Sequence, residues 1–166
     1  KDKGQVLSSG VAFEISTPYL TAELFDIKFA QSADVMYITH PSHATRKLSR
    51  TGHTAWTLTE VDFTNGPYLD TNTSTTTLTT SHSSVGTGRT LTASANLWVS
   101  TDVGRLVRFR DGYGKITGYN SATVVDWEVL VDTGSASAST DWSLGAFSDT
   151  TGHPSCVTFF EQRLVF

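Results

Sequence analysis

One segment constrains the fold more than any other, because residues 123–131 alternate between apolar and polar side chains. Its apolar face carries Val125, Trp127, Val129 and Val131. Asp126 and Glu128 fall on the opposite face. Successive side chains of a strand point to opposite faces of a sheet, so this period of two predicts a half-buried β-strand. We expect the stretch from Trp98 to Phe147 to be organised around this strand.

Neighbouring segments repeat the alternation and are separated by residues that favour tight turns. Residues 105–110 place Val107 and Phe109 on one face of a second predicted strand. Asp111 and Gly112 follow as a hairpin signal, because both residue types tolerate the positive φ of two-residue turns. Short strands with one apolar face and regular turns indicate a sheet that curls into a barrel or packs on another sheet.

Three short motifs and two flanking segments of this chain carry a family resemblance. The motifs are DVGR at 102–105, GYGKIT at 112–117 and SAT at 121–123, and the flanking segments are residues 30–41 and 152–164. Together they resemble the tail nozzle, or tail tubular, proteins of short-tailed bacteriophages over most of the chain. Residues 102–123 resemble the small β-barrel of those proteins, a module similar to the first catalytic-cysteine half-domain of ubiquitin-activating enzymes.

The resemblance implies a structural protein of a phage or prophage tail. Its subunits are expected to form a ring around the DNA channel, to contact other tail proteins, and to let double-stranded DNA pass without sequence-specific binding. The expected location is the virion tail, after synthesis in the bacterial host cytoplasm. No catalytic residue, cofactor or metal is implied, and no adenylation motif is present. The motif residues that we expect to act as structural turns are Asp102, Gly104, Asp111, Gly112 and Gly114.

Taken in order, the chain predicts an all-β fold in which a partial propeller-like antiparallel sheet precedes an inserted small antiparallel β-barrel. We assign residues 1–69 to the first sheet, 89–148 to the barrel, and 149–166 to a hairpin that returns to the first sheet. Residues 70–88 form a tract rich in Thr and Ser. It is either a solvated linker with almost nothing to bury or an edge strand favoured by its β-branched residues.

The first sheet is expected to contain short strands and one helical turn. Alternation predicts strands at residues 11–15, 25–29, 35–40, 46–50 and 54–58. Thr21 is a candidate cap for one helical turn at residues 22–25. The opening Lys-Asp-Lys-Gly and the strand-like end suggest a piece of a longer protein. We expect such a piece to be a monomer or a weak dimer through exposed strand edges, and the full-length protein to close into a ring.

Composition narrows the classes of function. The 166 residues include 38% hydrophobic and only 17% charged residues, against about 25% charged in typical globular chains. A net charge of −4 argues against coating nucleic acid through bulk charge. One cysteine excludes an internal disulfide framework, and no apolar run reaches the roughly 20 residues of a membrane-spanning helix. Two basic clusters, near Arg46 and near Arg108, are interpreted as solvated strand faces rather than binding patches.

Two histidines are candidate metal ligands. His40 and His43 flank a Pro-Ser pair, but a tetrahedral site needs further ligands. His53 is the nearest candidate in the sequence, and Cys156 is distant. We therefore predict ordinary loop histidines and no metal site.

Cys156 and two carboxylate pairs are candidate catalytic groups. Cys156 follows His153 closely, but it also begins an apolar alternation, so we predict a buried, unreactive thiol. The candidate glycosidase pairs are Asp126 with Glu128 and Asp102 with Asp111. A solvated strand face explains the first pair better than an active site does, and we predict no enzyme.

Four tryptophans raise an alternative function, a carbohydrate-binding or host-adhesion module. A sugar-stacking platform needs exposed indole rings, and the candidates are Trp56, Trp98, Trp127 and Trp142. Trp127 shares the apolar face of its strand, so we assign it to the core. Trp98 precedes a polar turn and stays open between the two interpretations.

Overall fold

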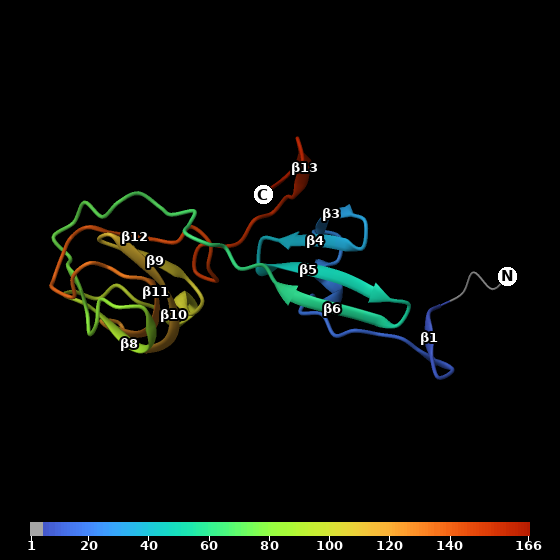
Figure 1. Cartoon of the computed structure of the whole chain (residues 1–166), viewed down its shortest axis with the longest axis horizontal. Coiled ribbons are helices and arrows are strands. Elements are labelled where there is room, and N and C mark those ends of the chain that lie inside the picture. Colours follow the sequence, from blue (N-terminus) through green and yellow to red (C-terminus); the bar gives the residue numbers. More distant parts are fainter. Residues whose placement is uncertain (1–4) are drawn as a thin grey trace. The chain divides into compact units, whose positions relative to one another are not determined.

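A computed structural model describes residues 5–166 and divides the chain into two compact units, which we describe separately (Figure 1). Unit 1 comprises Lys1–Asp62 and His153–Phe166, and unit 2 comprises Phe63–Gly152. The fold is all-β, as the sequence predicts, and unit 2 is inserted into unit 1 along the chain. None of the helices within residues 5–166 has the length and apolar character needed to span a membrane.

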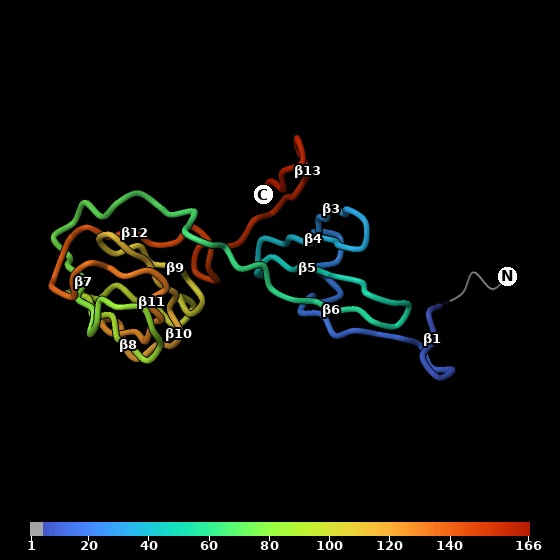
Figure 2. The backbone as a smooth tube through the Cα atoms, in the orientation of Figure 1, coloured from blue at the N-terminus to red at the C-terminus, as the bar shows by residue number. Residues whose placement is uncertain are grey.

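Unit 2 is a curled six-stranded antiparallel sheet with the order β12-β9-β10-β11-β8-β7 (Figure 2). Its elements are β7 (Leu78–Thr80), β8 (Gly86–Ala93), the 3-10 turn η2 (Ser100–Asp102), β9 (Leu106–Phe109), β10 (Gly112–Ser121), β11 (Val124–Val131) and β12 (Trp142–Leu144). An antiparallel bridge joins Leu78 of the edge strand β7 to Ser139, shortly before β12. The sheet thereby forms a half-barrel around one interior.

The interior of unit 2 is filled by the alternating apolar residues of its strands. β11 contributes Val125, Trp127 and Val129, all fully buried, which confirms the predicted alternation for these three, whereas Val131, predicted on the same face, is exposed. The Trp127 indole nitrogen donates a hydrogen bond to Thr80 Oγ1 at 3.0 Å, so its one polar atom is paired. Burial of each large side chain of this kind contributes about 1.5–3 kcal/mol. Unit 2 therefore has a hydrophobic core of its own.

The hairpin between β9 and β10 differs from the expected one by a single residue. Phe109 pairs with Gly112, so the two turn residues are Arg110 and Asp111, and Arg110 takes the positive φ of 53°. Gly112 is instead the first residue of β10, and a Cβ there would overlap the main-chain oxygen of Val131. Gly112 is thus needed for close approach of two backbones, not for a left-handed turn.

The basic residues of the cluster near Arg108 are not simply solvated, contrary to the expectation of a solvated strand face. Arg105 is buried and pairs with Asp102 at 2.9 Å, while its Nε donates to the Gly145 carbonyl at 2.8 Å. Arg108 donates to Thr71 Oγ1 at 2.9 Å. These cations therefore fasten η2 and β9 to neighbouring segments of unit 2.

Residues 63–88 belong to unit 2, so the unit boundary precedes the one expected at 69. The Ala146 amide donates to the Pro67 carbonyl and the Leu69 amide to the Leu144 carbonyl. In the Thr/Ser-rich tract, Leu78 is fully buried in the edge strand β7. The tract therefore matches the edge-strand alternative rather than the solvated linker.

Unit 1 contains a four-stranded antiparallel meander with the order β3-β4-β5-β6 and two separate hairpins. Its elements are β1 (Leu7–Ser8), β2 (Val11–Ala12), the 3-10 turn η1 (Thr21–Glu23), β3 (Lys28–Ser32), β4 (Val35–His40), β5 (His43–Gly52), β6 (Ala55–Glu60), β13 (Thr158–Phe160) and β14 (Arg163–Val165). The strand expected at residues 11–15 ends at Ala12. The expected strand at 35–40 is β4.

Burial in unit 1 contrasts with that in unit 2. Among its described residues, the buried positions are Thr39, His40, Thr45 and Pro154. No large apolar side chain is buried in these parts of the chain, although the strands carry many. Unit 1 therefore presents its apolar residues half-buried or exposed instead of enclosing them in a core.

Candidate functional site

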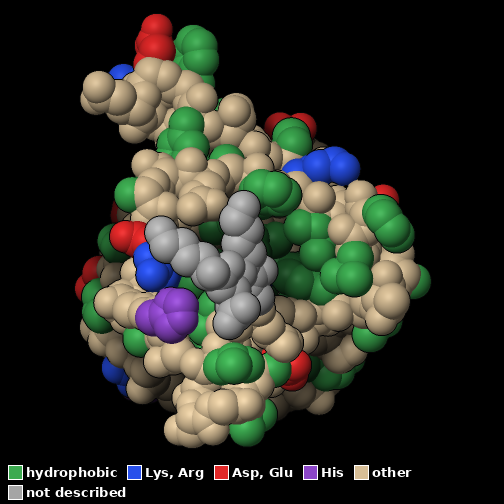
Figure 3. Space-filling model, turned by 90° about the vertical axis from the view of Figure 1, so that its right-hand side faces the viewer, with side chains coloured by type: hydrophobic (Ala, Val, Ile, Leu, Met, Phe, Trp, Pro, Cys, Tyr) green, Lys and Arg blue, Asp and Glu red, His purple; other side chains and the backbone are tan. Residues whose placement is uncertain are grey.

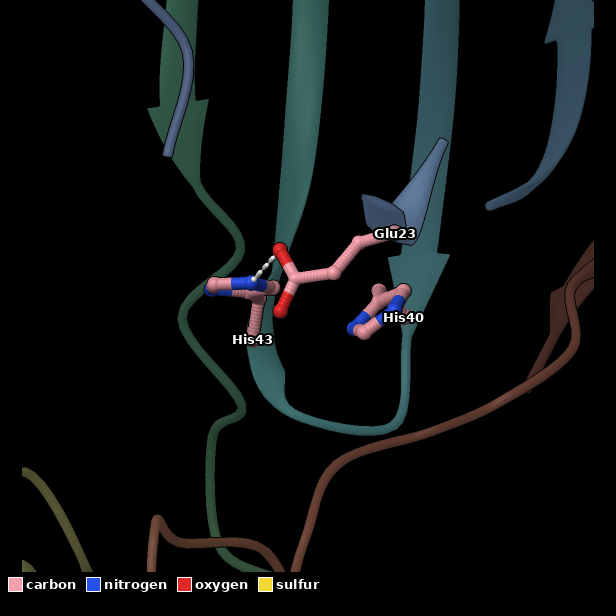
Figure 4. Close-up of side chains that lie close together, drawn as sticks. All are labelled: Glu23, His40 and His43. Atoms are coloured by element: carbon pink, nitrogen blue, oxygen red, sulfur yellow. Dashed lines mark hydrogen bonds and ion pairs between the residues drawn. The ribbon is translucent and has the colours of Figure 1, made fainter. Parts of the chain in front are cut away.

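Three side chains with metal-binding atoms converge at one end of the unit 1 sheet. They are Glu23 from η1, His40 from β4 and His43 from β5, and one ligand atom of each lies within 4.8 Å of the others (Figure 4). Figure 4 shows the three side chains pointing toward a common point. The sequence interpretation treated both histidines as ordinary loop residues, and the structure places them on strand ends beside a carboxylate.

The β4–β5 hairpin positions the two histidines. His40 ends β4, His43 begins β5, and they form a directly opposed cross-strand pair on either side of Pro41 and Ser42. Side chains of such a pair are close neighbours on one face, because their Cβ atoms lie about 4.5–5.5 Å apart. Here the two ring centroids are 5.0 Å apart.

Glu23 is oriented by its own turn and by His43. Its Oε2 accepts a hydrogen bond from the Leu20 amide at 2.8 Å and lies 2.8 Å from His43 Nε2. The Leu20 hydrogen bond, followed by the one from His43, lowers the pKa of the Glu23 carboxyl below its ordinary value. Glu23 therefore faces the histidines as a carboxylate.

His40 has an unsatisfied polar atom in this cluster. Its side chain is nearly inaccessible, at 3% exposure, and its Nδ1 accepts the Ser42 amide hydrogen at 3.1 Å. The other ring nitrogen, Nε2, has no hydrogen-bond partner among the described residues. An unpaired buried polar atom of this kind costs about 1–3 kcal/mol.

Tyr19 packs against both imidazoles. Its ring lies edge-on to His43 at a centroid distance of 5.3 Å and 6.2 Å from His40. Burial raises the pKa of the Tyr19 hydroxyl, and the positive charge of Arg46 partly offsets this. The phenol therefore stays protonated beside the cluster.

The other groups considered as ligands lie elsewhere. His53 follows β5, whose first residue is His43, so it is at the opposite end of that strand. Cys156 is exposed, and the prediction that it is a buried small hydrophobe is wrong, because β13 starts later and presents an exposed surface. Glu23 was missed because no local spacing links it to a hairpin that follows it at a distance in the chain.

The tryptophans do not form a stacking platform. Trp98, left open by the sequence, is buried at 1% exposure, and Trp127 and Trp142 are also in the core of unit 2. Trp56 lines a small pocket of about 80 Å³ in unit 1, below the roughly 300–1,000 Å³ of typical ligand sites. The guanidinium of Arg50 lies 5.8 Å from the centre of the Trp56 ring.

One carboxylate of each candidate pair, Asp102 and Asp126, has structural contacts. Asp102 is enclosed in its ion pair with Arg105 and also accepts the Thr150 hydroxyl hydrogen at 2.8 Å. Asp126 accepts a hydrogen bond from the Asn120 amide at 2.8 Å on a partly exposed strand face. Asp102 and Asp126 are therefore engaged in contacts within unit 2, which explain their positions without a catalytic role.

Large apolar side chains form a second feature of unit 1. Figure 3 shows hydrophobic side chains gathered around a hollow on the face it presents. Phe25 is 91% exposed and Phe29 and Phe160 are each 63% exposed. Phe25 follows η1, while Phe29 and Phe160 lie on β3 and β13, which contact each other. We refer to these three phenylalanines as the apolar surface of unit 1.

Comparison with known proteins assigns no family to the chain. No protein-family model matches it, and a search of curated proteins gives no match. The features of the chain that bear on function are therefore its fold, the histidine cluster and the apolar surface of unit 1.

Proposed function

We propose that this protein is a structural component of a phage or prophage tail, of the nozzle or tubular type, and that it acts in virion assembly rather than in catalysis. The observation that carries the proposal is the apolar surface of unit 1. Isolated exposed hydrophobic residues are normal on proteins. Unit 1 is unusual, because it exposes Phe25 and Phe29 while its described residues bury no large apolar side chain.

Such a surface favours association with further protein. Transfer of one phenylalanine side chain out of water contributes about 1.5–3 kcal/mol, so each of the three that a partner covers strengthens the association. We propose that a neighbouring subunit covers them and that repetition of this contact closes a ring. Ring closure requires a heterologous interface, in which the apolar surface of one subunit meets a different surface of the next.

Unit 2 fits the role of a rigid module carried by such a ring. Its core is complete without further chain, and its buried ion pair fixes η2 against the sheet. A net charge of −4 suits a channel wall along which DNA passes without being held, because tight DNA binding relies on neutralising phosphates with Lys and Arg. The proposed partners are other subunits, other tail proteins and DNA in transit, and the proposed location is the virion tail.

Electron microscopy of the full-length protein tests this proposal. Negative-stain images are expected to show closed rings with a central channel, and antibodies against unit 2 are expected to label the tails of purified virions. A protein that is monomeric in these images and absent from virions contradicts the proposal. Binding to a glycan array in addition to that result would favour the adhesion alternative.

A further inference from the structure

We propose that Glu23, His40 and His43 bind a divalent cation of the zinc class and that this cation fastens η1 to the β4–β5 hairpin. Three donor groups from three elements converge, with one ligand atom of each within 4.8 Å of the others. An independent observation points to a ligand, because the enclosed His40 ring has a nitrogen without a partner among the described residues. A cation bound there would satisfy that nitrogen.

The donor set selects the class of metal. Two imidazoles and one carboxylate suit zinc and neighbouring transition metals, whereas magnesium and calcium prefer sites made of oxygen atoms. Zinc bonds of about 2.0–2.1 Å in a tetrahedron place ligand atoms about 3.3 Å apart. The Glu23–His43 pair at 2.8 Å is slightly closer than this, and side-chain rotation supplies the difference. Three protein ligands leave the fourth position for water.

Binding of a cation changes which ring nitrogen carries the proton in each histidine. In the cation-free cluster the neutral His43 imidazole donates its Nε2 hydrogen to Glu23, and a cation bound at Nε2 takes the place of that hydrogen while the proton moves to Nδ1. Neutral His40 carries its proton on Nε2, because Nδ1 accepts the Ser42 amide hydrogen. Coordination through Nε2 moves that proton to Nδ1 and releases the Ser42 hydrogen bond. Coordination in this way exchanges one hydrogen bond at His40 for a metal bond.

The architecture of unit 1 explains what a metal would contribute. Small units with little enclosed apolar surface are commonly stabilised by disulfides or by a structural metal. Unit 1 buries no large apolar side chain within its described residues, and the single cysteine of the chain excludes an internal disulfide. A cation joining η1 to β4 and β5 would link segments that are distant in sequence. It would also hold the turn that precedes Phe25.

Calorimetric titration of the chelator-treated and dialysed protein tests the proposal. We expect Zn²⁺ to bind at one site per chain with micromolar or tighter affinity and to raise the melting temperature. Co²⁺ is expected to bind with the strong visible absorption of a tetrahedral complex, and Mg²⁺ is expected not to bind. Glu23→Gln and His43→Gln are each expected to weaken Zn²⁺ binding at least tenfold.

The variants are chosen to separate ligation from folding. Both positions are partly exposed, and glutamine at position 23 retains an oxygen that accepts the Leu20 hydrogen bond. His53→Gln is the matched control, because His53 is an exposed histidine of the same unit and should leave binding unchanged. Circular dichroism verifies that each variant is folded before titration.

Two results would overturn the proposal. One is the lack of both Zn²⁺ binding and a Co²⁺ spectrum in the folded protein. The other is Zn²⁺ binding that Glu23→Gln and His43→Gln leave unchanged, which would assign the metal to another place in the chain. Neither result depends on ring formation. The metal site can therefore be disproved without affecting the proposed tail function, and the tail function can be disproved without affecting the metal site.

Discussion

Gly104 and Gly114 illustrate, at the scale of single residues, two different reasons for glycine in one motif region. Gly104 has a φ of 90° and open space where a Cβ would stand. Gly114 is enclosed, and a Cβ there would lie 2.6 Å from the Trp127 ring and overlap the Glu128 carbonyl oxygen. The first glycine is required by backbone conformation and the second by close packing.

Alanine at these two positions is therefore expected to have unequal effects. Gly104→Ala should lower the free energy of unfolding by about 1 kcal/mol, the cost of a left-handed conformation. Gly114→Ala should lower it by about 3 kcal/mol or more, because a main-chain oxygen must move. Urea denaturation of both variants measures the difference. Equal losses would show that the β10–β11 contact is not as close as described.

Cys156 gives a direct test of surface exposure. The thiol is exposed, so a thiol reagent should label it stoichiometrically in the folded protein. Mass spectrometry after native labelling detects the single adduct, and Cys156→Ser serves as the unlabelled control. Protection of the thiol until denaturant is added would contradict the exposed position and restore the burial predicted from the sequence.

Tyr68 couples the stability of unit 2 to alkaline pH. Burial, followed by the nearby Tyr113, raises the pKa of Tyr68 to about 12, and Arg108 partly opposes this. Below pH 10 the phenol is protonated in both the folded and unfolded states, so its contribution to stability is complete. Between pH 10 and pH 12 the unfolded chain releases the proton first, so the free energy of unfolding falls.

Replacement of the phenol isolates this effect from other titrating groups. Tyr68→Phe should lose less stability than the unmodified protein when urea denaturation is compared at about pH 9 and about pH 11. An equal loss in both proteins would show that Tyr68 does not carry the pH dependence.

The turn η2 shows how one buried ion pair organises an element. Asp102 accepts the Val99 amide and the Thr150 hydroxyl hydrogens, and Arg105 reaches the Gly145 carbonyl. Asp102→Ala leaves the Arg105 guanidinium buried without its counter-charge, which typically costs 3–5 kcal/mol, so we expect a loss of about 4 kcal/mol. Thermal and urea denaturation measure this loss in the free energy of unfolding.

Asp70→Ala is the control, because it removes an exposed carboxylate. Its free energy of unfolding should stay within about 0.5 kcal/mol of that of the parent protein. A similar loss in the Asp102→Ala and Asp70→Ala variants would contradict the structural role of Asp102.

Strands were the part of the fold that the sequence predicted best. The alternation in β11 and the bounds of β4 follow from local pattern, because side chains of a strand point alternately to its two faces. The sequence left the burial of Trp98 open, and it predicted a buried Cys156 where the structure has an exposed one. Both depend on which distant segments cover a residue, and no local pattern encodes that.

The histidine cluster was only half predictable for the same reason. His40 and His43 form a cross-strand pair on either side of Pro41 and Ser42, where the sequence predicted only loop histidines. Glu23 enters through η1, a turn that precedes the sheet, and its approach depends on tertiary structure. The spacing of residues along the sequence therefore could not identify Glu23 as a member of the cluster.

At the scale of the whole molecule, the two units differ in how they are stabilised. Unit 2 encloses a continuous set of apolar side chains, whereas the described part of unit 1 encloses none of large size. We infer that unit 1 obtains part of its stability from association, through the apolar surface formed by Phe25, Phe29 and Phe160. The proposed tail function depends on this association.

Light scattering of the full-length protein that carries these residues tests the claim most directly. We predict a mass of several subunits for the parent protein, a shift toward the monomer for the double variant Phe25→Ser, Phe29→Ser, and no shift for Val85→Ser, an exposed apolar residue of unit 2. Serine removes the apolar contacts at positions that are already exposed, so folding of the subunit should persist. A monomeric parent protein, or an assembly of unchanged mass in the double variant, would contradict the account.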